Sequence, residues 1–191
     1  MLHVLSARRS IRKFADRPVE KELIESIIHA ATVAPSGKNR QPWEFIVLTG
    51  TAKSKVADLV EAGAERAKES GIPAGSAKNS ARVMREAAYL VMVYNPLWQA
   101  DAEHSGVNRY MYSVDTQSLG AAIQNMLLQA QAYGLGSLWI CDVFYAEREL
   151  AELLRRSDEL VAAVAIGYPD EVPDMRPRKP VAEVTRWLEE V

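Results

Sequence analysis

The apolar residues of this chain recur with two periods, which predict both helices and strands. Helical spacing marks residues 20–34, 51–69, 112–133 and 146–156, and short apolar runs mark strands at 44–48, 88–94, 137–141 and 160–167. Pro35 ends the first helix, and Gly134 and Gly136 end the third. That third helix carries apolar or small residues on more than one face. One explanation is that the helix also packs against a partner subunit.

Other segments follow neither period. Residues 70–80 are rich in Gly, Ala and Ser, and are interpreted either as a mobile lid or as a plain surface loop. Residues 95–108 are irregular, and either cover a site or form an ordinary loop. Residues 167–180 hold too many prolines for a helix, and 181–191 are expected to form a short helix or strand. We expect residues 168–191 to be a C-terminal arm that packs on a partner.

Length and composition narrow the class of protein. The 191 residues fit one domain spanning 1–191, and 48% hydrophobic content is ample for a core. A net charge of −2 argues against a nucleic-acid or membrane-surface protein as a whole. The N-terminus lacks the apolar run of a signal peptide, and no stretch approaches the length of a membrane span. The single cysteine, Cys141, predicts a reducing compartment, the cytoplasm.

Two clusters of basic residues lie at opposite ends of the chain. Arg8, Ser10 and Arg12 share one face if their segment is extended, and Pro177 favours an extended backbone that points Arg176 and Arg178 the same way. The planar guanidinium donates hydrogen bonds in parallel pairs, which suits a phosphate. The two clusters are either a shared phosphate site or two unrelated solvated patches.

Other kinds of site find little support. The histidines His3, His29 and His104 lack ligand spacing among themselves or with Cys141, so no metal site is expected. The Gly134-Leu135-Gly136 motif lacks the third glycine of a dinucleotide loop and does not follow a strand. No Ser-His-Asp or Cys-His arrangement is evident. The donor-rich loop 35–43 is either a ligand contact or an ordinary helix-to-strand connector.

Taken together, four motifs resemble the nitroreductase family of FMN-dependent oxidoreductases. They are RRSIRKF at 8–14, APSGKNRQPW at 34–43, GLGSLW at 134–139, and GYPDE followed by RPRKP at 167–180. The resemblance implies an α+β fold with a mixed sheet of four or five strands flanked by helices. It also implies an intertwined homodimer with FMN at the subunit interface.

The resemblance assigns residues to the cofactor by position. The phosphate would be held by Arg8, Ser10, Arg176 and Arg178, with Arg9 nearby. Arg12 would reach the N1–C2=O edge of the flavin. Residues 35–39 would come from the other subunit, and residues 139–141 would run beside the ring near N5. The expected cofactor-binding residues are Arg8, Arg9, Ser10, Arg12, Pro35, Ser36, Asn39, Trp139, Ile140, Cys141, Arg176 and Arg178.

The reaction also follows from the resemblance. A hydride from NADH or NADPH would enter at flavin N5 and pass to a nitroaromatic, quinone or similar flat acceptor in a ping-pong cycle, so no protein acid, base or nucleophile is expected. Cys141 replaces a hydroxyl found in some relatives, and its weaker donor would favour two-electron chemistry. The alternatives are a flavin-fragmenting or dehalogenating enzyme of the same fold, a non-catalytic flavin storage or sensing protein, and a dimeric structural protein.

Overall fold

A four-stranded sheet lies at the centre of the computed structural model, which describes residues 2–100 and 106–189. Its order is β1 (Glu44–Leu48), β2 (Tyr89–Gln99), β4 (Asp158–Gly167) and β3 (Gly136–Ile140), and each neighbouring pair is antiparallel. The α+β class and the strand number are therefore confirmed. Parallel pairing, expected of a mixed sheet, is limited within the described residues to an isolated bridge between Ser10 and Ser137.

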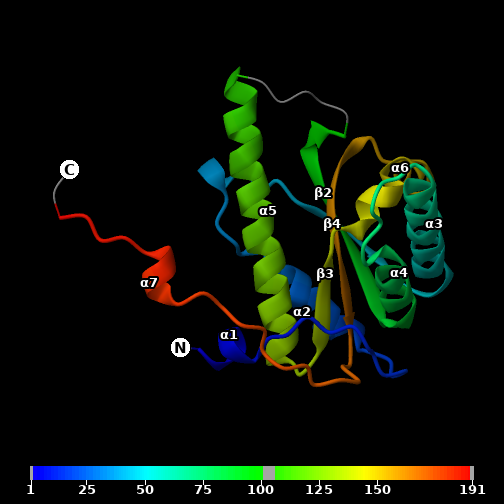
Figure 1. Cartoon of the computed structure of the whole chain (residues 1–191), viewed down its shortest axis with the longest axis horizontal. Helices are drawn as coiled ribbons and strands as arrows, with labels where there is room; N and C mark the ends of the chain where they lie inside the picture. The colour runs from blue at the N-terminus through cyan, green and yellow to red at the C-terminus, as the bar shows by residue number, and fades with distance from the viewer. Residues whose placement is uncertain (1, 101–105, 190–191) are drawn as a thin grey trace.

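Helices cover both faces of the sheet (Figure 1). One face packs against α2 (Lys21–Thr32) and α5 (Gly106–Ala132), and the other against α3 (Gly50–Glu69), α4 (Ala77–Glu86) and α6 (Glu147–Leu154). Strand β2 serves both cores because side chains alternate along a strand. Leu90 and Met92 contact the α3–α4 side, and Val91 and Val93 contact the α2–α5 side. The short elements are α1 (His3–Ala7), η1 (Gly37–Asn39), η2 (Asp142–Ala146) and α7 (Val181–Val184).

The two segments without periodicity contain more regular structure than expected. Strand β2 continues to Gln99 and α5 begins at Gly106, so the described residues of 95–108 are largely strand and helix. Residues 101–105, which include His104, lie outside the described part of the chain. In the other segment, Ala74 and Ala77 are buried against Ala64, and residues 77–80 are the first turn of α4. Residues 77–80 are helical, so neither interpretation of 70–80, a mobile lid or a plain surface loop, is correct for them.

The N-terminal segment crosses the edge of the sheet after α1. Its Ile11 N–H donates to the Ser137 carbonyl of β3 at 3.0 Å, and the Ala15 N–H donates to the Tyr168 carbonyl at 2.9 Å. In return, the Asp170 N–H donates to the Lys13 carbonyl at 2.9 Å. The segment therefore lies between β3 and the chain that leaves β4, which brings the two ends of the protein together.

A pair of glycines forms the floor under this segment. Gly136 of β3 and Gly167 of β4 are cross-strand partners. A Cβ on Gly136 would lie 2.8 Å from Ile11 Cγ1, and one on Gly167 would lie 2.9 Å from Phe14 Cδ1. Because neither glycine has a side chain, Ile11 and Phe14 pack directly on the sheet and are buried there. This floor fixes the height of the arginine segment above β3.

The C-terminal arm leaves the body of the protein. After Val172, which is fully exposed, nearly all described residues of the arm are exposed, and the ribbon runs away from the sheet and helices (Figure 1). The arm carries large apolar side chains, and Trp187 is 89% exposed. None of the helices in 2–100 and 106–189 combines the length and apolar character needed to cross a bilayer.

Candidate functional site

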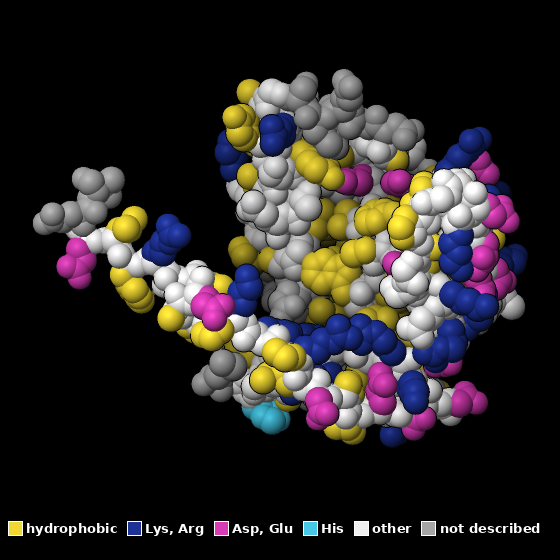
Figure 2. Space-filling model, in the orientation of Figure 1, with side chains coloured by type: hydrophobic (Ala, Val, Ile, Leu, Met, Phe, Trp, Pro, Cys, Tyr) yellow, Lys and Arg dark blue, Asp and Glu magenta, His cyan; other side chains and the backbone are white. Residues whose placement is uncertain are grey.

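A cavity of about 540 Å³ lies where the two ends of the chain meet. On the face shown in Figure 2, basic side chains form a band along the lower rim of an apolar hollow. The cavity is lined by Leu5, Ser6, Arg8, Arg9, Ser10, Arg12, Pro173, Asp174, Met175, Arg176 and Arg178. Both predicted basic clusters therefore contribute to one cavity, although they are separated by more than 160 residues of sequence.

Positive charge in this cavity is poorly compensated. Five arginines line it, against the single carboxylate of Asp174. None of the five forms an ion pair with a carboxylate in the described part of the chain, and several donate to nearby main-chain carbonyls instead. Burial and the neighbouring charges of Arg178 and Arg9 lower the pKa of Arg8. An anion placed among these side chains would relieve that repulsion.

One donor of Arg9 has no acceptor among the described residues. Arg9 donates from Nη1 to the carbonyls of Ser6 and Arg8, at 2.6 and 2.9 Å. Its Nε is buried and lacks a hydrogen-bond partner within residues 2–100 and 106–189. A buried donor without a partner is costly and uncommon in folded proteins. The five arginines give the cavity the positive charge that a phosphate group requires.

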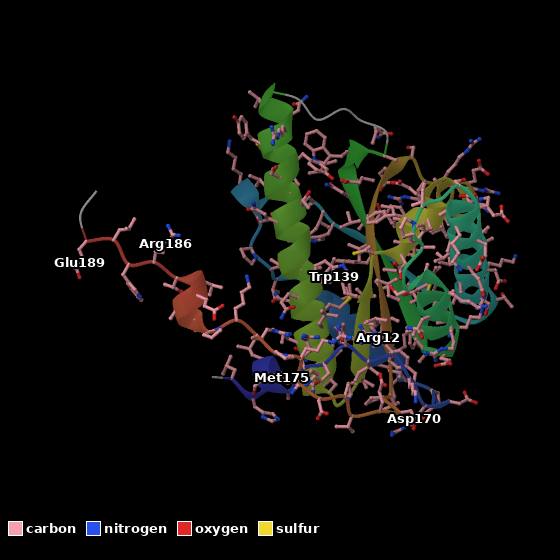
Figure 3. The ribbon with its side chains drawn as sticks, in the orientation of Figure 1. Arg12, Trp139, Asp170, Met175, Arg186 and Glu189 are labelled. Carbon is pink, nitrogen blue, oxygen red and sulfur yellow. The ribbon has the colours of Figure 1, made fainter. Side chains whose placement is uncertain are left out.

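Strand β3 passes this cavity at Ser137, and Trp139, Ile140 and Cys141 are absent from the cavity lining. Ser10 bridges to Ser137 of β3, two residues before Trp139. Figure 3 shows Trp139 between α5 and the sheet and Arg12 lower, where the N-terminal segment crosses. Trp139 is 37% exposed and Ile140 is buried. Cys141 is exposed. Partial desolvation, followed by the negative charge of Asp142, raises the pKa of its thiol, so the thiol is protonated and able to donate a hydrogen bond at neutral pH.

Residues 35–39 do not reach this cavity within one chain. Their loop is held against the middle of α5, where the Gly37 N–H donates to Ser118 Oγ at 3.3 Å. From Ser118 to Ala132, at the end of α5 beside α1, the helix rises about 20 Å at roughly 1.5 Å per residue (Figure 1). Pro35, Ser36 and Asn39 are absent from the cavity lining. Their assignment to the cofactor requires a second subunit and stays a prediction.

A buried carboxylate fixes this loop. Asp115 of α5 is fully buried and accepts two hydrogen bonds from Arg40, both at 3.0 Å, and one from Trp98 Nε1 at 2.9 Å. Asp115 lies nine residues after the start of α5, well inside the helix. No spacing in the sequence links Arg40, Trp98 and Asp115, so this cluster was not predicted.

Two further side chains at the arginine segment also escaped the sequence analysis. Glu171 accepts hydrogen bonds from the main-chain N–H groups of Arg12 and Lys13, and Arg82 donates to the Arg12 carbonyl. Glu171 stands inside the GYPDE motif, which is the one signal that could have identified it. Arg82 lies on α4, and nothing in its sequence neighbourhood points to residue 12.

Comparison with known proteins shows which family shares these features. A sequence model of the Nitroreductase family matches residues 5–168. A protein of Archaeoglobus fulgidus, provisionally named NADH dehydrogenase/NAD(P)H nitroreductase, is 32% identical over 177 residues. That alignment covers 91% of this chain and 87% of the archaeal protein.

Solved structures share the fold, two of them over nearly their whole length. A Desulfovibrio desulfuricans protein, provisionally described as a nitroreductase and crystallised in complex with FMN, has a TM-score of 0.74 at 29% identity, covering 99% of this chain and 95% of that chain. A BluB-like flavoprotein from Clostridium difficile 630 has a TM-score of 0.78 at 27% identity, covering 97% of each chain. Because the family match spans most of the chain and the archaeal relative aligns with nearly all of it, this protein belongs to the nitroreductase family.

Proposed function

We propose that this protein is an FMN-dependent oxidoreductase that uses NADH or NADPH to reduce nitroaromatics, quinones or similar flat acceptors in a ping-pong cycle. The observation that carries the proposal is the cavity in which five uncompensated arginines from both ends of the chain converge. The FMN bound by a family member and the NAD(P)H named for the archaeal relative support it.

The residues present fit the phosphate of FMN. Arg8, Ser10, Arg176 and Arg178 would hold it, because they supply fixed donors and positive charge around one cavity. Arg9 also lines the cavity and would add positive charge nearby. Bound FMN would supply the redox chemistry by accepting a hydride at N5 and releasing it to the acceptor. The protein then needs only to hold the cofactor and leave one face of its ring accessible.

The remaining assigned residues would surround the ring. Arg12 would place positive charge at the N1–C2=O edge, where negative charge develops on reduction, and so favour the reduced cofactor. Residues 139–141 would run along one side, and the protonated Cys141 would offer a hydrogen bond near N5. In support, Arg12 lines the cavity, and residues 139–141 follow Ser137, which bridges to Ser10 beside it.

A homodimer would complete the site. Loop 35–39 is about 20 Å along α5 from the cavity of its own chain, so it would contact the FMN of the partner. The exposed apolar side chains of the arm, Val181, Val184, Trp187 and Leu188, would pack on that partner. Burying a tryptophan and three aliphatic side chains supplies several kcal/mol, at about 25 cal/mol per Å² of apolar surface. Deleting residues 180–191 should therefore weaken the dimer, measured by analytical ultracentrifugation.

The decisive experiment is spectroscopic. The purified protein should show flavin absorbance, and anaerobic NADH or NADPH should bleach it. A quinone or a nitroaromatic should restore the oxidised spectrum, and the steady-state rates should give parallel double-reciprocal lines. A protein that binds no flavin would refute the proposal, whereas bound flavin without turnover would favour a storage or sensing protein.

A further inference from the structure

The main chain of Arg12 is held by two side chains of opposite charge that come from distant elements. We propose that Glu171 and Arg82 are positioning residues that fix Arg12 from its two sides and so set the reduction potential and the ring affinity of the bound flavin. The proposal rests on the proposed function, since it concerns the residue assigned to the flavin ring. Neither Glu171 nor Arg82 lines the phosphate cavity.

Glu171 holds the amide side of the segment. Its Oε1 accepts the N–H of Arg12 and, at 3.2 Å, the N–H of Lys13. Both bonds join residues more than 150 positions apart in sequence. Hydrogen bonds to an ionised carboxylate are about twice as strong as neutral ones, so a single side chain anchors two consecutive amides. Without Glu171 those amides would need water or a rearranged backbone as partners.

Arg82 holds the carbonyl side. Its Nη2 donates to the Arg12 carbonyl at 3.1 Å and to Asn79 Oδ1 at 2.8 Å, while its Nη1 is 2.6 Å from both carboxylate oxygens of Glu86. Asn79 and Glu86 belong to the same helix, α4, so the guanidinium is oriented before it meets Arg12. Helix α4 packs on α3, which ties Arg12 to the rigid core.

In the described chain, the main-chain groups of Arg12 are not held by regular strand pairing. The segment pairs with β3 through an isolated bridge at Ser10 and with the chain after β4 through another at Phe14. Arg12 lies between the two bridges, so side chains replace a strand partner for its N–H and C=O. The Arg12 guanidinium itself makes a bond from Nη1 to the Ser10 carbonyl at 3.2 Å. Its other donors remain for a ligand.

The effect of Arg12 on the flavin ring depends on how closely its guanidinium is held in place. Electrostatic stabilisation by a fixed charge depends on distance, and a site that is loose by about 1 Å loses much of its effect. Removing Glu171 leaves the backbone of Arg12 held from one side, so its guanidinium samples more positions. The stabilisation of the reduced ring then falls. The phosphate site is affected less, because Arg8, Arg176 and Arg178 are not bonded to Glu171.

The experiment compares Glu171→Ala, Glu171→Gln and Arg82→Ala in the full-length protein. The matched control is Asp170→Asn, because Asp170 is adjacent and exposed and its carboxylate bonds to nothing in the described chain. Affinity for FMN and for riboflavin, which lacks the phosphate, is measured by fluorescence titration. The midpoint potential is measured by anaerobic dye titration, and the melting temperature of the flavin-free protein reports folding.

We expect Glu171→Ala to weaken FMN and riboflavin binding by the same factor, about tenfold for the loss of charge-assisted bonds. Its midpoint potential should become more negative. Glu171→Gln should recover most of both properties, because the amide oxygen still accepts an N–H. Arg82→Ala should shift the potential in the same direction, and it tests the same residue independently if Glu171→Ala does not fold.

The inference is overturned if both alanine variants keep the wild-type potential and riboflavin affinity, or if Asp170→Asn has the same effect as Glu171→Ala. It is also overturned if Glu171→Ala weakens FMN binding alone, since that result would place its action at the phosphate. A wild-type protein that binds neither flavin would refute the proposed function itself. These outcomes are distinct, because the wild-type titration is read before any variant is compared.

Discussion

Replacing Gly136 by alanine should disturb the flavin site without touching any residue that lines it. The new Cβ would lie 2.8 Å from Ile11 Cγ1 and 3.0 Å from Ile11 Cβ and Cγ2. Since ordinary contacts begin near 3.4 Å, Ile11 would have to withdraw by roughly 0.6 Å. The backbone of Gly136 is not in the left-handed region, so the conflict is purely one of space.

The magnitude follows from what Ile11 would lose. Its N–H donates to the Ser137 carbonyl at 3.0 Å, and a retreat of that size stretches the bond beyond useful length. A lost hydrogen bond and an overpacked contact together cost about 2 kcal/mol. For a chain of this size that corresponds to a fall of roughly 4–8 °C in melting temperature. Ser10 and Arg12 flank Ile11, so FMN affinity should fall by about tenfold as well.

The assay is a double-mutant cycle with Ile11→Ala. That substitution alone should cost about 2–4 kcal/mol, because Ile11 is buried. It also removes Cγ1 and Cγ2, two of the three atoms in the conflict. The double variant should therefore be about as stable as Ile11→Ala alone, by urea denaturation. Gly120→Ala is the control, because its Cβ would meet nothing closer than Trp139 at 3.9 Å.

Two results would show that this reasoning is wrong. One is a Gly136→Ala protein that keeps the wild-type melting temperature and FMN affinity, which would mean that the segment around Ile11 moves away from β3 without loss of stability. The other is strict additivity in the cycle with Ile11→Ala, which would mean that the two side chains do not compete for the same space. Gly120→Ala should be neutral or stabilising by up to about 1 kcal/mol, since it removes a glycine from a helix interior.

Three other predictions concern charged groups. Arg8→Ala and Arg178→Ala should each weaken FMN binding by about tenfold while leaving riboflavin affinity unchanged, and the fluorescence titrations of the variants should depend less on salt than those of the wild type. Asp115→Ala should cost about 3 kcal/mol in urea denaturation, because Arg40 and the indole of Trp98 lose a buried acceptor. Burial lowers the pKa of Lys53, so below its ordinary pKa of 10.5 the unfolded chain binds more protons than the folded chain. Between pH 7 and 10, the free energy of unfolding of the wild type should therefore rise with pH relative to that of Lys53→Met, measured by urea denaturation.

The helices and strands predicted correctly from the sequence are those whose own residues carry the hydrophobic pattern. Residues 88–94 are apolar because β2 is covered on both faces, and this part was predicted correctly. The continuation to Gln99 was not, because it is stabilised by pairing with β4 across two irregularities in register rather than by its own pattern. Helix α4 was missed entirely, and the weakness of its signal is clearest at its start. Its buried residues there are alanines and a serine, which leave a weak hydrophobic signal.

The candidate site divides in the same way. Arginines that serve an anion occur in clusters, and clusters are visible in a sequence, so both halves of the cavity were predicted. Glu171 and Arg82 bond to the main chain of Arg12. Because main-chain groups are alike in nearly all residues, the sequence does not indicate which residue such a side chain contacts. Contacts across 159 and 70 residues leave no spacing to recognise. The supporting residues of a site therefore require the structure, even where its ligand-facing residues do not.

The distribution of charge explains how one protein can bind a small anion selectively. The chain has 23 basic and 25 acidic side chains, so at long range it repels polyanions such as nucleic acid. Elsewhere on the surface, several of the arginines pair with carboxylates, as Arg85 does with Asp58 and Glu61. The arginines of the cavity do not, and their attraction acts only over about one Debye length, roughly 10 Å. A ligand small enough to enter the cavity experiences this field, and a large polyanion outside meets the negative surface first.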